Sequence, residues 1–161
     1  MNLTGKAALI TGGARIGRAV AEEFARRGCR VAVTYRSSRK SALETVASLR
    51  KLGGEATALR CDVTNEKDVR AAVAHTVRAF GSLDIVINMA SIYGRTPYAR
   101  LTRKDWDANL NANLTSAHLV VLHAAPHLKR RGGRVVNIAD WVAASGRPQY
   151  KSSPPYSPPN A

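Results

Sequence analysis

Hydrophobic residues along the chain alternate between two spacings. Short apolar stretches rich in β-branched residues predict five buried strands, at 6–11, 30–35, 55–61, 84–88 and 134–138. Between them, apolar residues recur every three or four positions, which predicts amphipathic helices over 16–27, 38–52, 65–80 and 105–130. Ile16, Val20 and Phe24 show this spacing in the first helix. The pattern therefore predicts strands and helices in alternation.

Residues that start and end helices lie where the hydrophobic pattern changes. Thr64 is positioned to cap the third helix, and 102–105 (Thr-Arg-Lys-Asp) is typical of a capping box that opens the fourth. Glycines, which often end helices, follow the four segments at positions 28, 53–54, 81 and 132–133. These signals indicate short turns between most elements.

Alternating strands and helices joined by short turns predict the α/β fold class, with one doubly wound parallel sheet and right-handed crossovers. We expect the strand order 3-2-1-4-5, without the last strands that such sheets often contain. The length of 161 residues fits one domain with a sizeable core. In such sheets, ligands bind at the carboxyl ends of the strands.

The segment 10–17 joins the first strand to the first helix and contains three glycines. A strand, a glycine turn and a helix in this order place helix N–H groups against a phosphate. The spacing of Gly12 and Gly17 also fits the outer glycines of a P-loop, but Arg18 and Ala19 follow where that loop needs lysine and a hydroxyl residue. An ordinary turn without a ligand is the alternative if no other feature agrees.

Small, polar and charged residues follow every predicted strand. Beyond the glycine turn, these residues are 36–38, 62–63, 88–91 and 140–141. Because the carboxyl ends of parallel strands meet at one edge of a sheet, we expect these groups to converge there. Their convergence is the main indication of a functional site.

Residues 36–38 bear on the choice of cofactor. A domain that binds NAD places an acidic residue about 20 positions beyond the glycines, to hold the ribose 2′-hydroxyl. Here Arg36, Ser37 and Ser38 occupy this region, and no acidic residue occurs before Glu44. A guanidinium beside two hydroxyls suits the 2′-phosphate of NADP. The alternative is a surface arginine at a strand end.

The chain is strongly basic, with 25 Lys+Arg against 11 Asp+Glu and a net charge of +14. This charge suits a nucleic-acid partner, but the basic residues are scattered and aromatic residues make up only 6%. A solvated surface is therefore the favoured interpretation. Cys29 and Cys61 lie in apolar segments and are expected to be buried thiols of a reducing compartment. Without a signal peptide or a run of 18 apolar residues, we expect a cytoplasmic protein with no membrane partner and no metal site.

Taken together, these motifs resemble the short-chain dehydrogenase/reductase family, whose nucleotide-binding domain has the Rossmann fold. The shared marks, in order, are 11–17, 62–63, 88–91, Asn113 and Asp140. Asp140 stands where the family usually has a catalytic serine, and together with 35–37 and 88–91 this is similar to the pteridine reductase branch. The resemblance extends from residue 6 to about residue 156.

This resemblance implies an NADP-dependent oxidoreductase that transfers a hydride to a small-molecule carbonyl or pterin-like C=N group. It implies a reaction centre of Asn113, Asp140 and Tyr156, with the tyrosine phenol as the proton donor. It also implies a homo-oligomer at full length, with the 105–130 helix at a subunit interface. The residues expected to bind the cofactor are Gly12, Arg15, Ile16, Gly17, Arg36, Ser37, Asp62, Val63, Asn88 and Ala90.

The chain departs from the family pattern at three points. Its glycine motif is one residue shorter. Asn160 takes the place of the lysine that lowers the tyrosine pKa in the family, and Pro158 and Pro159 precede it. Family members also continue for longer. We therefore expect an incomplete, truncated NADP-binding domain over 1–151, a disordered or non-native tail over 152–161, and impaired activity.

Two other functions stay open at this stage. A non-catalytic nucleotide-binding or interaction protein would bind NADPH without turning it over. A basic nucleic-acid binder would bind DNA in a salt-sensitive manner and would not bind NADPH.

Overall fold

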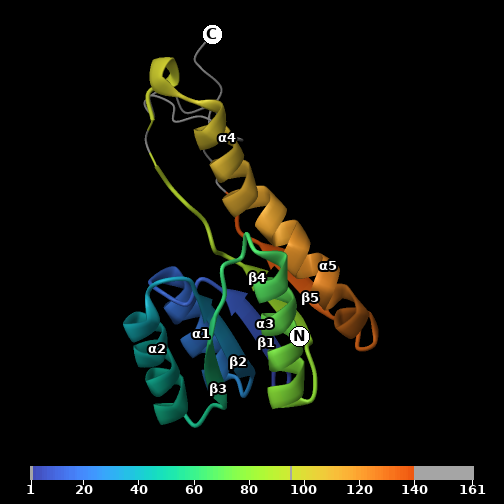
Figure 1. Ribbon diagram of the computed structural model, residues 1–161. Helices are drawn as coiled ribbons and strands as arrows, with labels where there is room; N and C mark the ends of the chain where they lie inside the picture. Colours follow the sequence, from blue (N-terminus) through green and yellow to red (C-terminus); the bar gives the residue numbers. More distant parts are fainter. Residues whose placement is uncertain (1, 95, 140–161) are drawn as a thin grey trace.

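The computed structural model describes residues 2–94 and 96–139 (Figure 1). Its sheet contains the strands β1 (Ala7–Thr11), β2 (Arg30–Tyr35), β3 (Ala56–Arg60), β4 (Ile85–Asn88) and β5 (Arg134–Asn137). All neighbouring strands are parallel, and their order is β3-β2-β1-β4-β5. The predicted fold class and strand order are confirmed.

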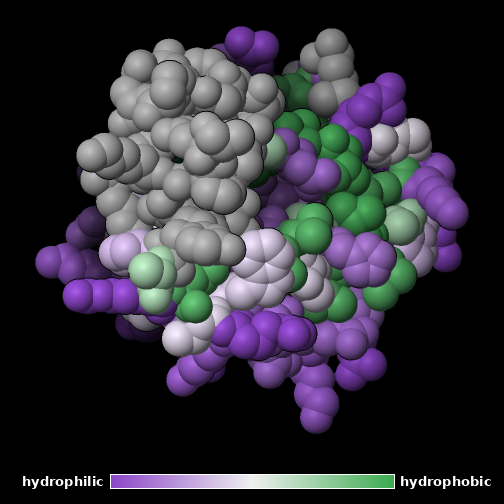
Figure 2. Space-filling view, turned by 90° about the horizontal axis from the view of Figure 1, so that it is seen from above, coloured by the Kyte–Doolittle hydropathy of each residue, from purple (hydrophilic) through white to green (hydrophobic). Residues whose placement is uncertain are grey.

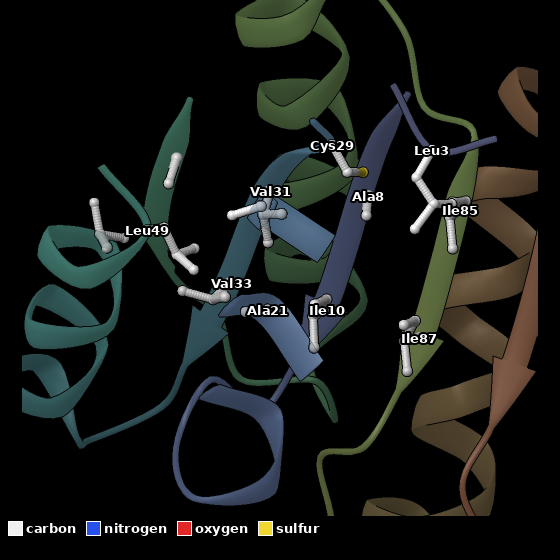
Figure 3. Packing of buried hydrophobic residues seen from close by; sticks show 13 residues of the cluster. Leu3, Ala8, Ile10, Ala21, Cys29, Val31, Val33, Leu49, Ile85 and Ile87 are labelled. Atoms are coloured by element: carbon white, nitrogen blue, oxygen red, sulfur yellow. The ribbon is translucent and has the colours of Figure 1, made fainter. Parts of the chain in front are cut away.

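Helices cover both faces of the sheet (Figure 1). α1 (Ile16–Arg26) and α2 (Arg39–Lys51) pack on one face, and α3 (Glu66–Phe80) and α5 (Ser116–Lys129) pack on the other. Alternate residues of β1, β2, β3 and β4 enter the two cores, so that Ile10 faces α1 whereas Leu9 faces α3 and α5. Figure 3 shows the first core, where side chains of β1, β2 and β4 meet α1 and α2. Burial on both faces explains why β1, β2 and β4 are apolar nearly throughout, whereas every residue of β5 is exposed.

A long helical segment leads from the loop after β4 to β5. It follows a 3₁₀ turn (Tyr98–Arg100) and comprises α4 (Arg103–Leu110), a π-helical turn (Asn111–Thr115) and α5. Figure 1 shows α4 extending beyond the carboxyl edge of the sheet. The predicted capping box is confirmed, because the Asp105 N–H donates to the Thr102 hydroxyl at 3.2 Å and the Thr102 N–H donates to the Asp105 carboxylate at 3.0 Å.

The cap of α3 differs from the prediction. Asn65, not Thr64, is the N-cap residue, and its side-chain oxygen accepts the N–H groups of Lys67 at 3.0 Å and Asp68 at 3.3 Å. The Thr64 hydroxyl instead donates to the Asp62 carboxylate at 2.7 Å. The prediction was wrong because Asp62 offers Thr64 a charged acceptor, while the amide of Asn65 satisfies the first turn of the helix.

Both cysteines are buried free thiols, as predicted. Burial raises the pKa of Cys29 and of Cys61 to about 12, and the nearby carboxylates of Asp84 and Asp68, respectively, act in the same direction. Both side chains therefore stay protonated at neutral pH. No helix within the described ranges combines the length and the apolarity needed to cross a membrane.

At the amino ends of the strands, the carboxylate of Asp84 joins β1 to β4 and to the end of α5. Its side chain is only 3% exposed. One oxygen accepts the Ala7 N–H and the Ser82 hydroxyl, both at 2.9 Å, and the other lies 2.8 Å from Arg131 Nε and 3.6 Å from Lys6 Nζ. Burial alone raises the pKa of Asp84, but these hydrogen bonds and charges outweigh it and lower the pKa.

Asp84→Asn is expected to lower the free energy of unfolding by about 2 kcal/mol, because a buried, hydrogen-bonded charge is lost while its cationic partners remain. Since folding lowers this pKa, the stabilisation is present above the ordinary carboxyl value of 3.8 and is lost as the pH falls through the lower folded-state value. Urea unfolding at a series of pH values from neutral to acid measures both effects.

The matched control is Asp107→Asn, which removes an exposed carboxylate that pairs with Arg103 one helical turn away. Exposed pairs of this kind contribute less than about 0.5 kcal/mol. Equal stabilities of Asp84→Asn and Asp107→Asn at neutral pH would contradict the role given to Asp84.

Candidate functional site

A cavity of about 270 Å³ lies at the carboxyl ends of the strands. Its walls come mainly from the residues that follow β1, β2, β3 and β4, with Ala112 of the π-helical turn beside them. Figure 2 views the protein from this side, where hydrophilic side chains project around the periphery. The residues that follow the first four strands therefore converge at one edge of the sheet, as the sequence predicted.

The cavity gathers most of the residues predicted to bind a cofactor. Those that line it are Gly12, Arg36, Ser37, Asp62, Val63 and Ala90. Arg15, Ile16 and Gly17 lie in the same turn and at the start of α1, directly after the lining residue Ala14. Asn88 is buried at the end of β4 and is not a lining residue. Asp140 and Tyr156 lie outside the described residues.

Two glycines let the turn after β1 approach its neighbours closely. Gly12 has a φ of 83°, and a Cβ added there would lie 3.3 Å from the backbone nitrogen of Ala90. A Cβ at Gly17 would overlap the carbonyl oxygen of Gly12. The turn is also bonded to β2, because the N–H of Gly12 donates to the Thr34 hydroxyl at 3.4 Å and that of Gly13 to the Thr34 carbonyl at 3.1 Å.

Arg15 is strained in this short turn. It has φ 52° and ψ −114°, a conformation that favours glycine. As the residue before α1, it makes no side-chain cap, and the first turn of α1 contains no acidic residue. Within the described residues, the N–H groups of Arg15 and Ile16 find no acceptor. The amino end of α1 therefore retains its positive partial charge and free donors, which suit an anion.

The Thr11 hydroxyl connects the glycine turn to the loop after β4. It accepts the N–H groups of Met89 at 3.0 Å and Ala90 at 3.1 Å. The neighbouring Asn88 side chain donates to the Asn137 side chain at 2.8 Å, which ties the end of β4 to β5. These bonds fix the wall of the cavity that lies between β1 and β4.

Asn113 holds the loop after β4 from the opposite side. Its side-chain oxygen accepts the N–H of Ile92 at 3.0 Å, and its side-chain nitrogen donates to the carbonyl of Ile92 at 3.3 Å. Asn113 lies in the π-helical turn, and Ile92 lines the cavity. Asn113 therefore fixes the backbone behind the cavity.

The electrostatics of the cavity centre on Asp62 and Arg36. Hydrogen bonds from the Thr64 hydroxyl and N–H lower the pKa of Asp62, and the charges of Arg36 and Arg60 lower it further. Asp62 therefore stays ionised and accepts hydrogen bonds. It is the one acidic residue among the described lining residues, and it follows β3. The lining residues that follow β2, Arg36, Ser37 and Ser38, carry a guanidinium and two hydroxyls.

Three buried threonines contribute to the site, of which the sequence analysis included Thr11, as part of the glycine motif, but neither Thr34 nor Thr45. Thr11 and Thr34 are 2% exposed and make the bonds described above, and Thr45 of α2 is fully buried and donates to the Gly13 carbonyl at 3.0 Å. The sequence feature that could have pointed to them is a hydroxyl residue at a position that the hydrophobic pattern assigns to the core. Such a group needs a partner, because an unsatisfied buried hydroxyl is costly.

The parallel sheet, the glycine turn and the cavity at the carboxyl edge define a doubly wound nucleotide-binding protein. The chain belongs to the short chain dehydrogenase family, which it matches over residues 6–157. This membership confirms the family predicted from the motifs.

Named relatives support the same class. The chain is 38% identical over 151 residues to a hydroxynaphthalene reductase-like protein, Arp2, of Metarhizium robertsii, covering 92% of this chain and 56% of that protein. It is 33% identical to the 3-oxoacyl-[acyl-carrier-protein] reductase FabG of Staphylococcus aureus, covering 89% and 59%. A short chain dehydrogenase of Burkholderia cenocepacia in complex with NADP is 39% identical, with a TM-score of 0.86 and coverages of 91% and 60%.

The chain spans between half and two thirds of the length of these relatives. The two reductases are named for substrates other than pterins, so the narrower placement in the pteridine reductase branch stays a prediction. The broader class, an oxidoreductase family with the Rossmann fold, is shared by the relatives and by this chain.

Arg15→Gly is expected to raise the free energy of unfolding by about 1 kcal/mol, because glycine adopts the backbone conformation of Arg15 without strain. Chemical unfolding measures the difference. The matched control is Arg18→Gly, which puts the same substitution inside α1 and should lower stability by about 1 kcal/mol. If Arg15→Gly is destabilised as much as Arg18→Gly, the turn is not strained at Arg15.

Proposed function

We propose that the cavity binds NADP(H) and that the protein to which this chain belongs uses it to reduce a carbonyl compound. The observation that carries the proposal is the end of β2, where Arg36, Ser37 and Ser38 line the cavity and the segment itself contributes no carboxylate; the one acidic lining residue described, Asp62, follows β3. An arginine with neighbouring hydroxyls binds a phosphate by charge-assisted hydrogen bonds. NAD has no phosphate at this position and pairs better with an acidic side chain.

The residues present fit the rest of the cofactor as well. The free N–H groups of Arg15 and Ile16 at the amino end of α1 suit its pyrophosphate. Gly12 lines the cavity without a side chain that would keep a ligand from its backbone, and the ionised Asp62 accepts hydrogen bonds from an amino group such as that of adenine. The relative from Burkholderia cenocepacia, which was crystallised with NADP, supports this choice of cofactor.

For the substrate, we propose a small-molecule ketone before a pterin. The name of one relative specifies a 3-oxoacyl group, which carries a ketone. The cofactor, when bound, supplies a hydride to the carbonyl carbon. Tyr156 would supply the proton to the developing oxygen anion, Asp140 would orient the substrate, and Asn113 would support the proton path. A pterin-like C=N group remains the narrower alternative that follows from Asp140.

We propose that this chain turns over slowly. At Asn160 a neutral side chain stands where the family has a lysine, so that position supplies no cation to favour the ionised form of the Tyr156 phenol. NADPH oxidation in the presence of an aromatic ketone measures turnover. A fast rate that Tyr156→Phe abolishes would contradict impaired activity, whereas tight NADPH binding without turnover is the behaviour of a non-catalytic binding protein.

We further propose that the full-length protein is a homo-oligomer. The side chains of Leu114 and Leu122, eight residues apart on the long helical segment, are 65% and 51% exposed. Exposed apolar residues that share one side of a helix are typical of a contact surface.

Titration of the chain with NADPH and NADH tests the proposed cofactor. We expect NADPH to bind at least about tenfold more tightly, since a charge-assisted contact to phosphate contributes roughly 1.4 kcal/mol or more. Arg36→Asp should remove this preference, because a carboxylate repels the 2′-phosphate and accepts the 2′-hydroxyl of NADH. Fluorescence of the bound nicotinamide is the readout.

Arg70→Asp is the matched control, with the same change of charge on the exposed face of α3 and away from the lining residues. It should leave the preference for NADPH intact. Equal affinities of the parent chain for NADPH and NADH, or an equal effect of the two substitutions, would contradict the proposal.

A further inference from the structure

The hydroxyl of Thr45 makes an unusual contact for a threonine inside a helix. Thr45 lies in α2 with no exposed surface. Its hydroxyl lies 3.0 Å from the carbonyl oxygen of Ser41, one turn earlier in the same helix, and 3.0 Å from that of Gly13 in the glycine turn. The first contact is common for helical threonines. The second joins residues 32 positions apart, so helix geometry alone does not account for it. The single hydroxyl proton is shared between the two carbonyls; that of Ser41 also faces the Thr45 N–H one helical turn on, whereas that of Gly13 has no other donor among the described residues.

Gly13 is fixed by several neighbours. Its N–H donates to the Thr34 carbonyl at 3.1 Å, and a Cβ added to it would lie only 2.8 Å from the Cβ of Val33. Its carbonyl oxygen accepts the Thr45 hydroxyl. The strand β2 therefore holds Gly13 on one side, while α2 sets the direction of its carbonyl.

The direction of this carbonyl also sets the direction of an N–H group. The carbonyl of Gly13 and the N–H of Ala14 belong to one planar trans peptide, in which the two bonds point in opposite directions. Because Thr45 holds the carbonyl toward α2, the Ala14 N–H points away from α2. Ala14 lines the cavity, and its N–H has no acceptor among the described residues.

We infer that Thr45 is a positioning residue, which orients the Gly13–Ala14 peptide so that the Ala14 N–H serves as a donor to an anionic group in the cavity. Together with the N–H groups of Arg15 and Ile16, it makes a run of three consecutive donors without an acceptor among the described residues at the amino end of α1, where a phosphate is favoured. This inference rests on the proposed binding of NADP(H). Part of the affinity for the cofactor's phosphates would then depend on Thr45, a core residue of α2.

A role in packing alone is the competing explanation, and the chain offers a matched control. Thr76 is a second fully buried helical threonine, located in α3. Its hydroxyl donates to the carbonyl of Ala72 in its own helix at 2.8 Å. Thr76→Val and Thr45→Val therefore remove the same buried hydroxyl from a helix, but only the second leaves the Gly13 carbonyl without its donor.

The test compares Thr45→Val, Thr45→Ser and Thr76→Val in the full chain. We expect Thr45→Val to weaken NADPH binding by about tenfold, since the bond to Gly13 is lost and a buried carbonyl is left unsatisfied. Thr45→Ser retains the hydroxyl and should bind within about twofold of the parent chain. Thr76→Val should reduce stability without changing the dissociation constant for NADPH.

A second readout needs no ligand. Hydrogen exchange of the Gly13 and Gly17 amides, which donate to the carbonyls of Thr34 and Ala14, should be faster in Thr45→Val than in the parent chain and unchanged in Thr76→Val, because only Thr45→Val loosens the turn that these bonds close. Unchanged binding by Thr45→Val, a loss that Thr45→Ser does not restore, or unchanged exchange would overturn the inference. If the parent chain fails to bind NADPH, the proposed function fails, and exchange alone then decides whether Thr45 orients this peptide.

Discussion

The hydrogen bonds that fix β4 against both ends of β1 are the constraint on which the rest of the structure depends. At the amino end, the buried Asp84 carboxylate accepts the N–H of Ala7, and at the carboxyl end the Thr11 hydroxyl accepts the N–H groups of Met89 and Ala90. The chain order reverses between these two strands, since β2 and β3 lie to one side of β1, and β4 and β5 to the other. A crevice forms at such a reversal, and here it is the cavity lined by both loops.

The cavity combines close backbone approach with positive charge. Gly12 and Gly17 allow the turn to fold tightly, but the shortness of the turn leaves Arg15 in a conformation that favours glycine. Strain of this kind persists where surrounding contacts hold the backbone, and here Thr34 and Thr45 hold Gly13. The N–H groups of the next three residues, Ala14, Arg15 and Ile16, have no acceptor among the described residues and are left as donors for an anion. Stability and proposed binding thus depend on the same few hydrogen bonds.

The sequence predicted the class, the strand order and the edge of the sheet that forms the cavity, because buried strands and amphipathic helices leave clear periodic patterns. It also located six of the lining residues, Gly12, Arg36, Ser37, Asp62, Val63 and Ala90, since they follow strands directly. It did not find the cap at Asn65 or the contacts of Thr34 and Thr45. These depend on which polar groups meet after the helices have packed, and local spacing does not record such long-range pairing.

The central claim is that the carboxyl edge of this sheet binds NADP(H) through the glycine turn and the end of β2. Backbone amide NMR spectra recorded during titration with NADP⁺ test it most directly. The account predicts saturable shifts at residues 12–17, 34–38, 62–64 and 89–92, and unchanged signals around Asp84 at the opposite edge. Shifts confined to the opposite edge or to the exposed faces of α3 and α5, or no shifts at saturating concentration, would contradict it.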